Sequence, residues 1–323
     1  MPDLVTLEAI RDAARRIGGV VRRTPVLDVS QAPESPLWLK CENLQLAGAF
    51  KIRGALNMIG RLDPATSRRG VITYSSGNHG RAVALAAKLA GIPATVVMPV
   101  TAPPIKVGAV KDLGAEVILE GTTSADRKQR ADQEAQARGL IIVPPFDHEW
   151  IIAGQGTIAL EIVEQCPNLS QVYVPVGGGG LISGIAAGVK QLKKGIRVIG
   201  VEPEGAAKMS VSLSAGHPVT LPKSTSIADG LLPVRPGDLT FVHVREFVDE
   251  VLTVTDSSIA TAVGWLFREG KLVVEPSGAT AFAAAIAGRE KGESQGATVA
   301  ILSGGNIAAS DLAALVDGGF ANP

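Results

Sequence analysis

The chain has 323 residues, of which 46% are hydrophobic and 19% charged, so it carries enough apolar material for a large core. Its 31 basic and 31 acidic residues cancel, and only 4% of its residues are aromatic. This balance argues against the basic patches and stacking surfaces of nucleic-acid-binding proteins and against an anionic membrane surface. We therefore expect a small-molecule partner and no nucleic-acid or membrane partner.

The N-terminal segment, 1–16, is interrupted by charged residues, unlike a signal peptide. No uncharged apolar run is long enough to cross a bilayer. Cys41 and Cys166 lie far apart and form neither a metal-binding pair nor a disulfide framework, so we expect two buried free thiols. These features predict a cytoplasmic protein.

The first predicted element is a helix that begins after Thr6 and ends at Gly18 and Gly19. After it, short β-rich runs alternate with Ala-rich helical stretches. The predicted strands are 37–41, 71–74, 94–98, 116–119, 140–143, 172–176, 197–201, 250–254 and 299–303, and the predicted helices are 78–90, 103–113, 124–138, 150–165, 181–193, 256–270, 277–290 and 306–316. Several strands are continuous apolar runs, which is typical of parallel strands covered on both faces. The alternation predicts an α/β fold with mostly parallel, twisted sheets and helices on both faces.

The domain organisation has to be inferred without a linker, since no Ser/Pro-rich stretch divides the chain. Residues 62–148 hold four strand–helix units that can form a small sheet of their own. We expect a discontinuous large domain of residues 1–61 and 149–323, and a small mobile domain of residues 62–148. The stretch 217–235 is rich in Pro and Gly and is expected to cross the surface near the mouth of a site.

Glycine-rich segments follow three of the predicted strands, at 75–80, 177–180 and 303–306, each before a predicted helix. Ligands of parallel α/β sheets lie beyond the carboxyl ends of the strands. Helix N-termini attract anions, and glycine lets a phosphate or carboxylate approach the backbone closely. Three such segments together predict an anionic ligand.

Other ligand classes have weaker support in the sequence. No GxxxxGK[ST] motif is present. Gly178 and Gly180 could begin a GxGxxG pattern, but Ser183 occupies its third glycine position, while Glu202 ends the next strand as a ribose-binding acid would. An NAD-dependent dehydrogenase therefore stays open as an alternative, although it leaves Lys51 without a role. The four histidines are dispersed, which argues against a histidine metal site.

Six motifs occur in order along nearly the whole chain: KCENLQ at 40–45, GAFKIRGA at 48–55, SSGNHG at 75–80, GGGG at 177–180, EPSGA at 275–279 and SGGN at 303–306. This set resembles the serine/threonine dehydratase and serine racemase family of fold-type II pyridoxal-phosphate enzymes. The resemblance implies a two-domain, tryptophan synthase β-like α/β fold, pyridoxal 5′-phosphate bound by the large domain, and a homodimer.

The resemblance also implies an activity, the elimination of water and ammonia from a small β-hydroxy amino acid of the threonine or serine type. The products would be an α-keto acid and ammonia. A serine racemase with side dehydratase activity and a phenylserine or 3-hydroxyaspartate dehydratase stay open as alternatives.

The resemblance implies roles for cofactor-binding residues. Lys51 would form the Schiff base and then serve as the catalytic base. Phe50 would pack against the ring, Asn78 would bond its hydroxyl, and Ser303 would face its nitrogen, with a helix N-cap as a second role. A neutral hydroxyl there makes the ring a weaker electron sink, which favours rapid β-elimination. The other implied cofactor residues are Gly177, Gly178, Gly179, Gly180 and Leu181 around the phosphate, and Glu275.

The implied substrate-binding residues are Ser75, Ser76, Gly77, Asn78, His79 and Arg127. Backbone N–H groups of the 75–80 loop would bind the substrate carboxylate. Ser76 matches the catalytic position that protonates the opposite face of the substrate in racemases. We expect His79 to be a structural or carboxylate-side residue rather than a general base. Arg127 matches an active-site arginine of racemase-like members, and a solvated helix arginine is its alternative interpretation.

A cation-binding segment of the racemase-like members aligns with Glu202, Ala206 and Lys208. Glu202 and the Ala206 carbonyl remain available, but Lys208 stands where a second acidic ligand is expected. We hypothesise that the Lys208 ammonium replaces the metal and pairs with Glu202, which would make activity independent of Mg²⁺. An exposed helix lysine is the alternative.

Two further departures concern the substrate. Ala47 and Ala49 flank Gly48 where the family usually has Thr-Gly-Ser, which makes the turn before the lysine less polar. Pro233 stands where racemase-like relatives offer a serine to the substrate. Both leave the substrate open, and Pro233 shifts the expectation away from dedicated serine racemisation.

Overall fold

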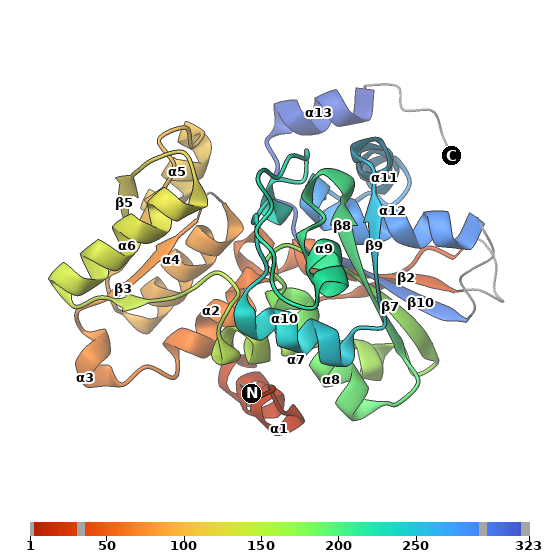
Figure 1. The fold of residues 1–323 in the computed structure, drawn as a ribbon, viewed down its shortest axis with the longest axis horizontal. Helices are drawn as coiled ribbons and strands as arrows, with labels where there is room; N and C mark the ends of the chain where they lie inside the picture. The colour runs from red at the N-terminus through yellow and green to blue at the C-terminus, as the bar shows by residue number, and fades with distance from the viewer. Residues whose placement is uncertain (1–2, 31–35, 76, 291–295, 318–323) are drawn as a thin grey trace.

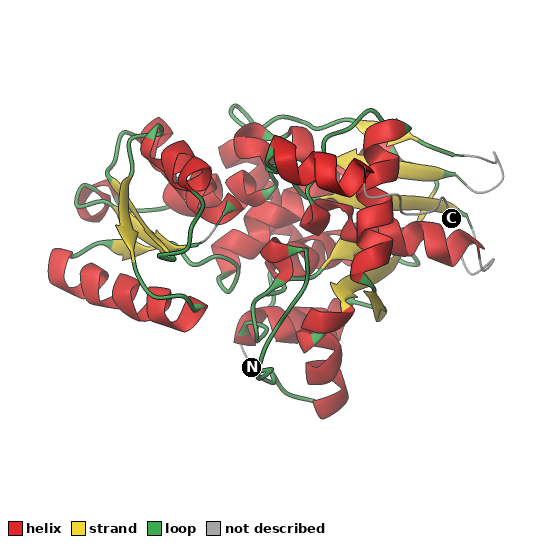
Figure 2. Ribbon diagram, turned by 90° about the horizontal axis from the view of Figure 1, so that it is seen from above, coloured by secondary structure: helices red, strands yellow, loops and turns green. Residues whose placement is uncertain are grey.

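The computed structural model describes residues 3–30, 36–75, 77–290 and 296–317. It contains a larger sheet with strand order β1-β2-β10-β7-β8-β9 and a smaller sheet with order β5-β4-β3-β6. The smaller sheet and its helices lie at one end of the molecule, on the left in Figure 1, and helices cover both sheets (Figure 2). Strand pairs in both sheets are parallel, except that β1 runs antiparallel to β2. The predicted α/β fold is therefore confirmed.

The larger sheet is covered by helices on both faces because successive side chains of a strand point to opposite sides. Val172 and Val174 of β7 pack with α7 and α8, whereas Tyr173, between them, packs with α11 and α12. Its strands are β1 (Val26–Asp28), β2 (Leu37–Cys41), β7 (Leu169–Pro175), β8 (Arg197–Pro203), β9 (Glu250–Val254) and β10 (Ala297–Leu302). The helices around it are α1 (Leu7–Ile17), α2 (Lys51–Ile59), α7 (Glu149–Gln165), α8 (Gly180–Leu192), α9 (Lys208–Ala215), α10 (Asp238–Phe247), α11 (Asp256–Arg268), α12 (Pro276–Glu290) and α13 (Ala309–Asp317).

The smaller sheet is built from one continuous part of the chain. Its strands are β3 (Val71–Tyr74), β4 (Ala94–Met98), β5 (Glu116–Leu119) and β6 (Ile141–Ile142). They lie within residues 62–148, the segment predicted to form a small sheet. Its helices are α3 (Pro64–Ser67), α4 (Asn78–Ala90), α5 (Pro104–Lys111) and α6 (Ser124–Arg138), and short 3₁₀ turns elsewhere are η1 (Glu42–Leu44), η2 (Leu46–Gly48), η3 (Glu204–Ala206) and η4 (Asp229–Leu231). Helix α2 packs against both α4 and α7 and so joins the two parts.

One predicted helix start is wrong, and this affects Ser303. The last helix was predicted from residue 306, but α13 begins at Ala309, so Ser303 is not its N-cap. The backbone after Ser303 is used elsewhere, because Gly304 forms a β-bridge with Ala49 and the N–H of Gly305 donates to the carbonyl of Gly48 (2.9 Å). The third glycine-rich segment therefore supports the lysine turn instead of starting a helix.

Two remaining expectations concern the thiols and membrane association. Cys41 and Cys166 are both buried and free, as predicted. Within the part of the chain that the structure describes, no helix is both long enough and apolar enough to cross a membrane.

Candidate active site

Lys51 is the first residue of α2 and is half-buried. Its Nζ donates to the carbonyl of Pro145 (2.8 Å) and lies 5.1 Å from the centroid of the Phe50 ring. Burial lowers the pKa of the Lys51 amine to about 8. A fraction of the amine is therefore neutral near neutral pH, the form that attacks a carbonyl or accepts a proton.

The segment before Lys51 is fixed to the end of β10. Ala49 pairs with Gly304, and the N–H of Phe50 donates to the carbonyl of Ser303 (3.1 Å). Ser303 itself is buried, and its hydroxyl donates to the carbonyl of Ser277 (3.4 Å). The backbone thus brings Ser303 and the lysine turn together, although 252 positions separate Lys51 from Ser303 in the sequence.

The 177–180 loop connects β7 to α8 and presents bare backbone. A Cβ at Gly178 would lie 2.4 Å from the Phe146 ring, and one at Gly180 would lie 2.9 Å from Phe146. Gly179 has φ +101, and a Cβ there would lie 2.8 Å from Thr240. Only glycine fits these positions, and the first N–H groups of α8 have no intrahelical acceptor. The loop, with the buried Leu181 in that first turn, is therefore a cradle suited to a phosphate.

The glycine cradle and Lys51 contact adjacent residues of one segment. Phe146 covers the cradle, and its neighbour Pro145 accepts the hydrogen bond of the Lys51 amine. The sequence did not indicate Pro145, Phe146 or Thr240, because they act through a carbonyl, a ring face and a hydroxyl that carry no motif.

Asn78 links the smaller sheet to the larger one through its side-chain amide. Its Nδ2 donates to Oε1 of Glu275 (2.6 Å), and its Oδ1 accepts from Nδ2 of Asn306 (2.8 Å). Asn306 in turn accepts from Arg81 (2.7 Å). Burial, reinforced by the charge of Asp229, raises the pKa of Glu275 to about 8, so this carboxyl is mostly protonated at neutral pH. Arg81 was not predicted, and Asn306 was noted only as part of the SGGN motif.

The 75–80 loop follows β3 and leads into α4. The N–H of Gly77 donates to the hydroxyl of Ser75 (3.2 Å), while Ser76 lies outside the described residues. His79 is buried, and its Nε2 lies 3.0 Å from the carbonyl of Val143, so Nε2 carries the hydrogen. Burial, with a contribution from the Lys51 charge, lowers the pKa of His79 to about 3. His79 is neutral at physiological pH and holds Val143.

Arg127 lies on α6 and is buried, so the solvated-arginine interpretation is wrong. Its guanidinium donates to the carbonyl of Thr122 (3.3 Å) and to the hydroxyl of Ser124 (3.0 Å), both at the start of its own helix. These contacts hold Arg127 within the smaller-sheet part.

Glu202 of β8, Ala206 of η3 and Lys208 at the start of α9 lie together. Lys208 and Glu202 are fully buried, which rules out the exposed-lysine alternative, and Lys208 Nζ lies 3.1 Å from Oε1 of Glu202. Glu202 also accepts from the N–H groups of Met209 and Ser210 (2.9 Å each). This carboxylate is therefore turned inward. The dehydrogenase alternative instead requires it to face a ribose. Among the described residues, no cluster of three or more His, Cys, Asp or Glu forms a metal site.

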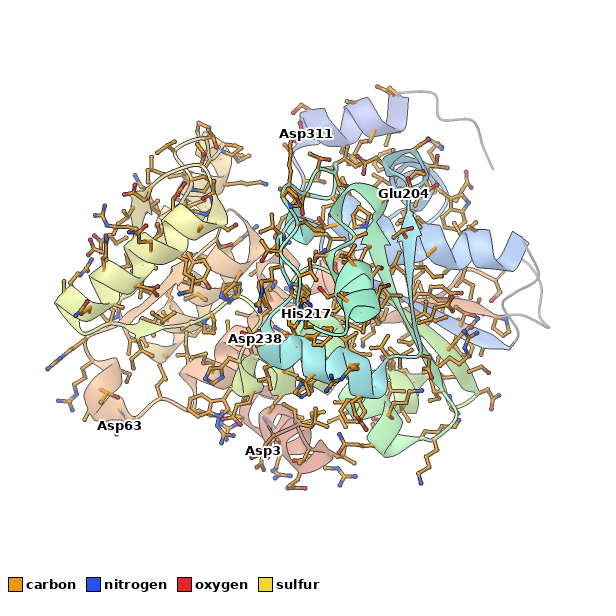
Figure 3. All side chains as sticks on the ribbon, viewed as in Figure 1. Asp3, Asp63, Glu204, His217, Asp238 and Asp311 are labelled. Atoms are coloured by element: carbon orange, nitrogen blue, oxygen red, sulfur yellow. The ribbon has the colours of Figure 1, made fainter. Side chains whose placement is uncertain are left out.

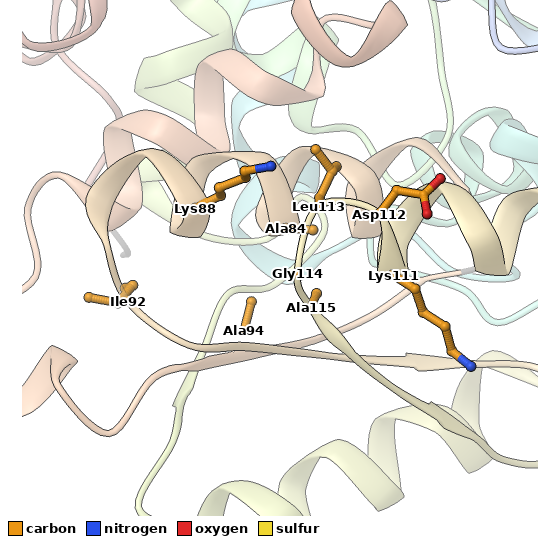
Figure 4. Close-up of a pocket in the computed structure, with 9 residues that line it drawn as sticks. All are labelled: Ala84, Lys88, Ile92, Ala94, Lys111, Asp112, Leu113, Gly114 and Ala115. Carbon is orange, nitrogen blue, oxygen red and sulfur yellow. The ribbon is translucent and has the colours of Figure 1, made fainter.

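A separate cavity of about 360 Å³ lies in the smaller-sheet part (Figure 4). Its lining comes from α4, α5, β4 and the connections beside them and is made of Ala84, Lys88, Ile92, Ala94, Lys111, Asp112, Leu113, Gly114 and Ala115. The lining contains none of the predicted site residues, so this cavity is distinct from the candidate site.

Comparison with known proteins agrees with this geometry. Residues 17–304 match the model of a family described as pyridoxal-phosphate-dependent enzymes. The chain is 42% identical over 314 residues to L-threonine ammonia-lyase of Geobacter sulfurreducens (96% of this chain, 78% of that protein). It is 42% identical over 308 residues to serine racemase of Oryza sativa subsp. indica (93% and 91%). The structure of maize serine racemase superposes with a TM-score of 0.91 at 41% identity, covering 96% of each chain.

The family match supports the pyridoxal-phosphate prediction over the nicotinamide alternative. The buried orientation of Glu202 also argues against the nicotinamide alternative. The matched region contains Lys51, the 177–180 cradle and Ser303. This chain belongs to the family of pyridoxal-phosphate-dependent enzymes.

Proposed function

We propose that this enzyme eliminates water from a small β-hydroxy amino acid of the threonine or serine type, releasing an α-keto acid and ammonia. The observation that carries the proposal is the half-buried Lys51 amine, with its lowered pKa, beside a bare-backbone cradle for an anion. Relatedness to a protein named L-threonine ammonia-lyase supports elimination as the reaction.

The residues present fit pyridoxal phosphate. The N–H groups of Gly177, Gly178, Gly179, Gly180 and Leu181 would hold the phosphate. Phe50 would pack on the ring, Asn78 with Glu275 would lie at the ring hydroxyl, and Ser303 would face the ring nitrogen. When bound, pyridoxal phosphate withdraws electrons from the substrate's α-carbon and so makes its proton removable.

The chain's own groups remove the substrate's proton and orient the substrate. The Lys51 amine removes the α-proton, since its pKa of about 8 lets it accept and release a proton near neutrality. The N–H groups of Asn78 and His79, at the start of α4, bind the substrate carboxylate. Those of Ser75 and Gly77 already donate to the Val97 carbonyl and the Ser75 hydroxyl, so these residues shape the loop. The neutral Ser303 hydroxyl gives weak support to charge on the ring nitrogen, which favours loss of the β-hydroxyl over prolonged proton exchange.

Serine racemisation is the second candidate function, and relatedness to the rice serine racemase favours it. Ser76 would be its second proton donor, and Arg127 would assist in substrate binding. Pro233, in place of a serine near the substrate, favours the elimination. A 3-hydroxyaspartate or phenylserine substrate remains within the same proposal.

The organisation of the whole protein is part of the proposal. We infer a large cofactor-binding domain (1–61 and 149–323), a small mobile domain (62–148), a homodimer and a cytoplasmic location. The position of the small sheet's strands within 62–148 supports the domain boundary.

A screen of the purified protein tests the function. We expect visible absorbance that borohydride removes, and keto-acid release from one or more of L- and D-serine, threonine, hydroxyaspartate and phenylserine. Lys51→Ala should lose both signals, because no other residue supplies the amine at that position. The control is Lys190→Ala, since Lys190 bonds to Ile196 and Asp249 at the far end of α8. A Lys51→Ala protein that stays coloured and active would overturn the assignment.

A further inference from the structure

Lys208 places its ammonium inside a closed cage of oxygen atoms. It is the first residue of α9, and its Nζ lies 2.8 Å from the carbonyl of Val176 and 2.9 Å from those of Ala206 and Leu231. A carboxylate oxygen of Glu202 lies 3.1 Å away. The side chains of both Lys208 and Glu202 are 0% exposed, so bulk solvent does not reach these contacts.

The cage requires the charged form of the amine. An ammonium has three N–H donors, one for each of the three carbonyls, and its charge faces the Glu202 carboxylate, whereas a neutral amine would turn its lone pair toward an oxygen. Burial lowers the pKa of Lys208, and the Glu202 carboxylate opposes that effect. Carbonyl and carboxylate oxygens are also the ligands that hard metal ions prefer. Here the ammonium occupies their centre, so the residues present do not fit a divalent cation.

The cage adjoins the glycine cradle. Val176 directly precedes Gly177 in the chain. Leu231 follows Gly230, whose carbonyl would lie 3.1 Å from a Cβ at Gly177. The ammonium therefore ties the end of β7 to η4, while Glu202 ties it to β8.

We propose that Lys208 is the built-in cation of this enzyme, a positioning residue that holds the first glycine of the cradle where a metal ion would otherwise be needed. Cofactor binding is then independent of divalent cations. The identity of the cradle's ligand rests on the proposed function, but the cage and its role do not depend on which amino acid is the substrate.

The first test uses the wild-type protein. After dialysis against EDTA, the Tm of the cofactor-free form and the Kd for pyridoxal phosphate are measured with and without Mg²⁺. Both values should be unchanged. A saturable rise in Tm or in cofactor affinity on adding Mg²⁺ would overturn the proposal, and this arm needs no variant to fold.

The second test empties the cage. Lys208→Ala leaves Glu202 buried without its partner, so we expect the Tm to fall by about 5 °C or more and cofactor affinity to fall by about 10-fold or more. Potassium or ammonium ions should enter the vacated cage and restore both values in a saturable way, whereas choline at the same ionic strength, being too large, should not. Lys190→Ala is the control, because it removes the same side chain from one carbonyl and one carboxylate at a more exposed site.

Each outcome decides the question. Unchanged affinity in Lys208→Ala, or a loss that no small cation restores, would mean that Lys208 acts by packing alone. If Lys208→Ala is insoluble without added salt, recovery during expression with potassium supports the cage, and failure to recover contradicts it. Because cofactor binding and melting are the readouts, a negative result leaves the proposed elimination untouched, and a failed keto-acid screen leaves the cage untouched.

Discussion

Glu275 carries a proton at neutral pH, and this has a thermodynamic consequence. Its carboxyl is 5% exposed and accepts a hydrogen bond from Asn78. Its pKa rises from 4.5 to about 8 on folding, so between these values the folded protein binds more protons than the unfolded chain. Stability from this group is therefore complete below pH 4.5 and is lost as the pH rises toward 8.

Glu275→Gln should remove this pH dependence. The amide keeps an oxygen for Asn78 and never ionises, so the Tm of the cofactor-free variant should gain on the wild type as the pH rises from about 5 to about 8. Thermal melting across that range is the measurement. Glu204→Gln, at the exposed carboxyl labelled in Figure 3, is the control and should show no such trend. Parallel curves for Glu275→Gln and the wild type would refute the protonated state.

The turn before Lys51 holds a non-glycine residue in a left-handed conformation. Ala47 has φ +58 and is followed by Gly48 at φ +74. The Cβ of Ala47 costs about 1 kcal/mol in this region, so Ala47→Gly should raise the free energy of unfolding by up to about 1 kcal/mol. Urea denaturation measures this. Ala49→Gly is the matched control: Ala49 is extended (φ −163) and buried, so glycine there should destabilise the protein. The idea fails if both variants change stability in the same direction.

Elements with local signals could be predicted from the sequence, and elements capped from a distance could not. Five strands have the predicted bounds: β2, β3, β4, β5 and β9. They are short β-rich runs closed by turn residues. Helix α10 was missed because its N-cap residue, Gly237, has no side chain, and the cap comes from Asp147 instead. Helix α2 was missed for the same reason, since Phe50 at its start offers no capping group.

The Asp147 carboxylate organises the start of α10, where Figure 3 labels Asp238. It accepts from the N–H groups of Asp238 and Leu239 (3.0 Å each) and Thr240 (3.1 Å). The Thr240 hydroxyl then donates to the carbonyl of Gly178 (2.7 Å). The cap of this helix thus supports the glycine cradle.

Asp147→Ala should therefore affect stability and cofactor binding together. Losing a carboxylate cap costs about 1–2 kcal/mol, and the Kd for pyridoxal phosphate should rise because Thr240 loses its fixed position. Thr123→Ala is the control, since Thr123 caps α6 in the smaller-sheet part and should lower stability alone. Denaturant unfolding and cofactor titration give the two readouts. Equal cofactor affinity in both variants would contradict the link.

The candidate site likewise contains residues that the sequence indicated and residues that it did not. Motifs predicted Lys51, Asn78, the glycine cradle, Glu275 and Ser303 as site residues, because the resemblance to the family implies roles for those residue types. The groups that position them lie far away in sequence and include the Pro145 carbonyl, the Phe146 ring and Asn306. No spacing rule connects these groups to their partners, so only the folded chain shows them.

At the scale of the whole molecule, a charged contact joins the two parts. Lys106 on α5 and Asp229 on η4 form one such pair (2.7 Å), with both side chains partly exposed. Exposed pairs contribute about 0–1 kcal/mol. If residues 62–148 move as the small domain proposed above, this pair would bias its closure without holding it shut.

Lys106→Ala should raise the KM by up to about 5-fold and leave the Tm nearly unchanged, because it removes a contact between the two parts and none within either core. Steady-state kinetics and thermal melting measure the two effects. Lys128→Ala, which breaks a comparable pair with Asp132 inside α6, should change neither. A KM equal to that of the wild type would argue against closure at this contact.

The backbone of residues 143–146 leads from the smaller sheet back to the larger one and contacts three parts of the candidate site. The carbonyl of Val143 holds His79, that of Pro145 holds the Lys51 amine, and Phe146 covers the glycine cradle. A movement of the smaller sheet would therefore be transmitted along this backbone to Pro145, and from the Pro145 carbonyl to the Lys51 amine through their hydrogen bond. These four consecutive residues, 143–146, thus couple the position of the Lys51 amine to the position of the smaller sheet.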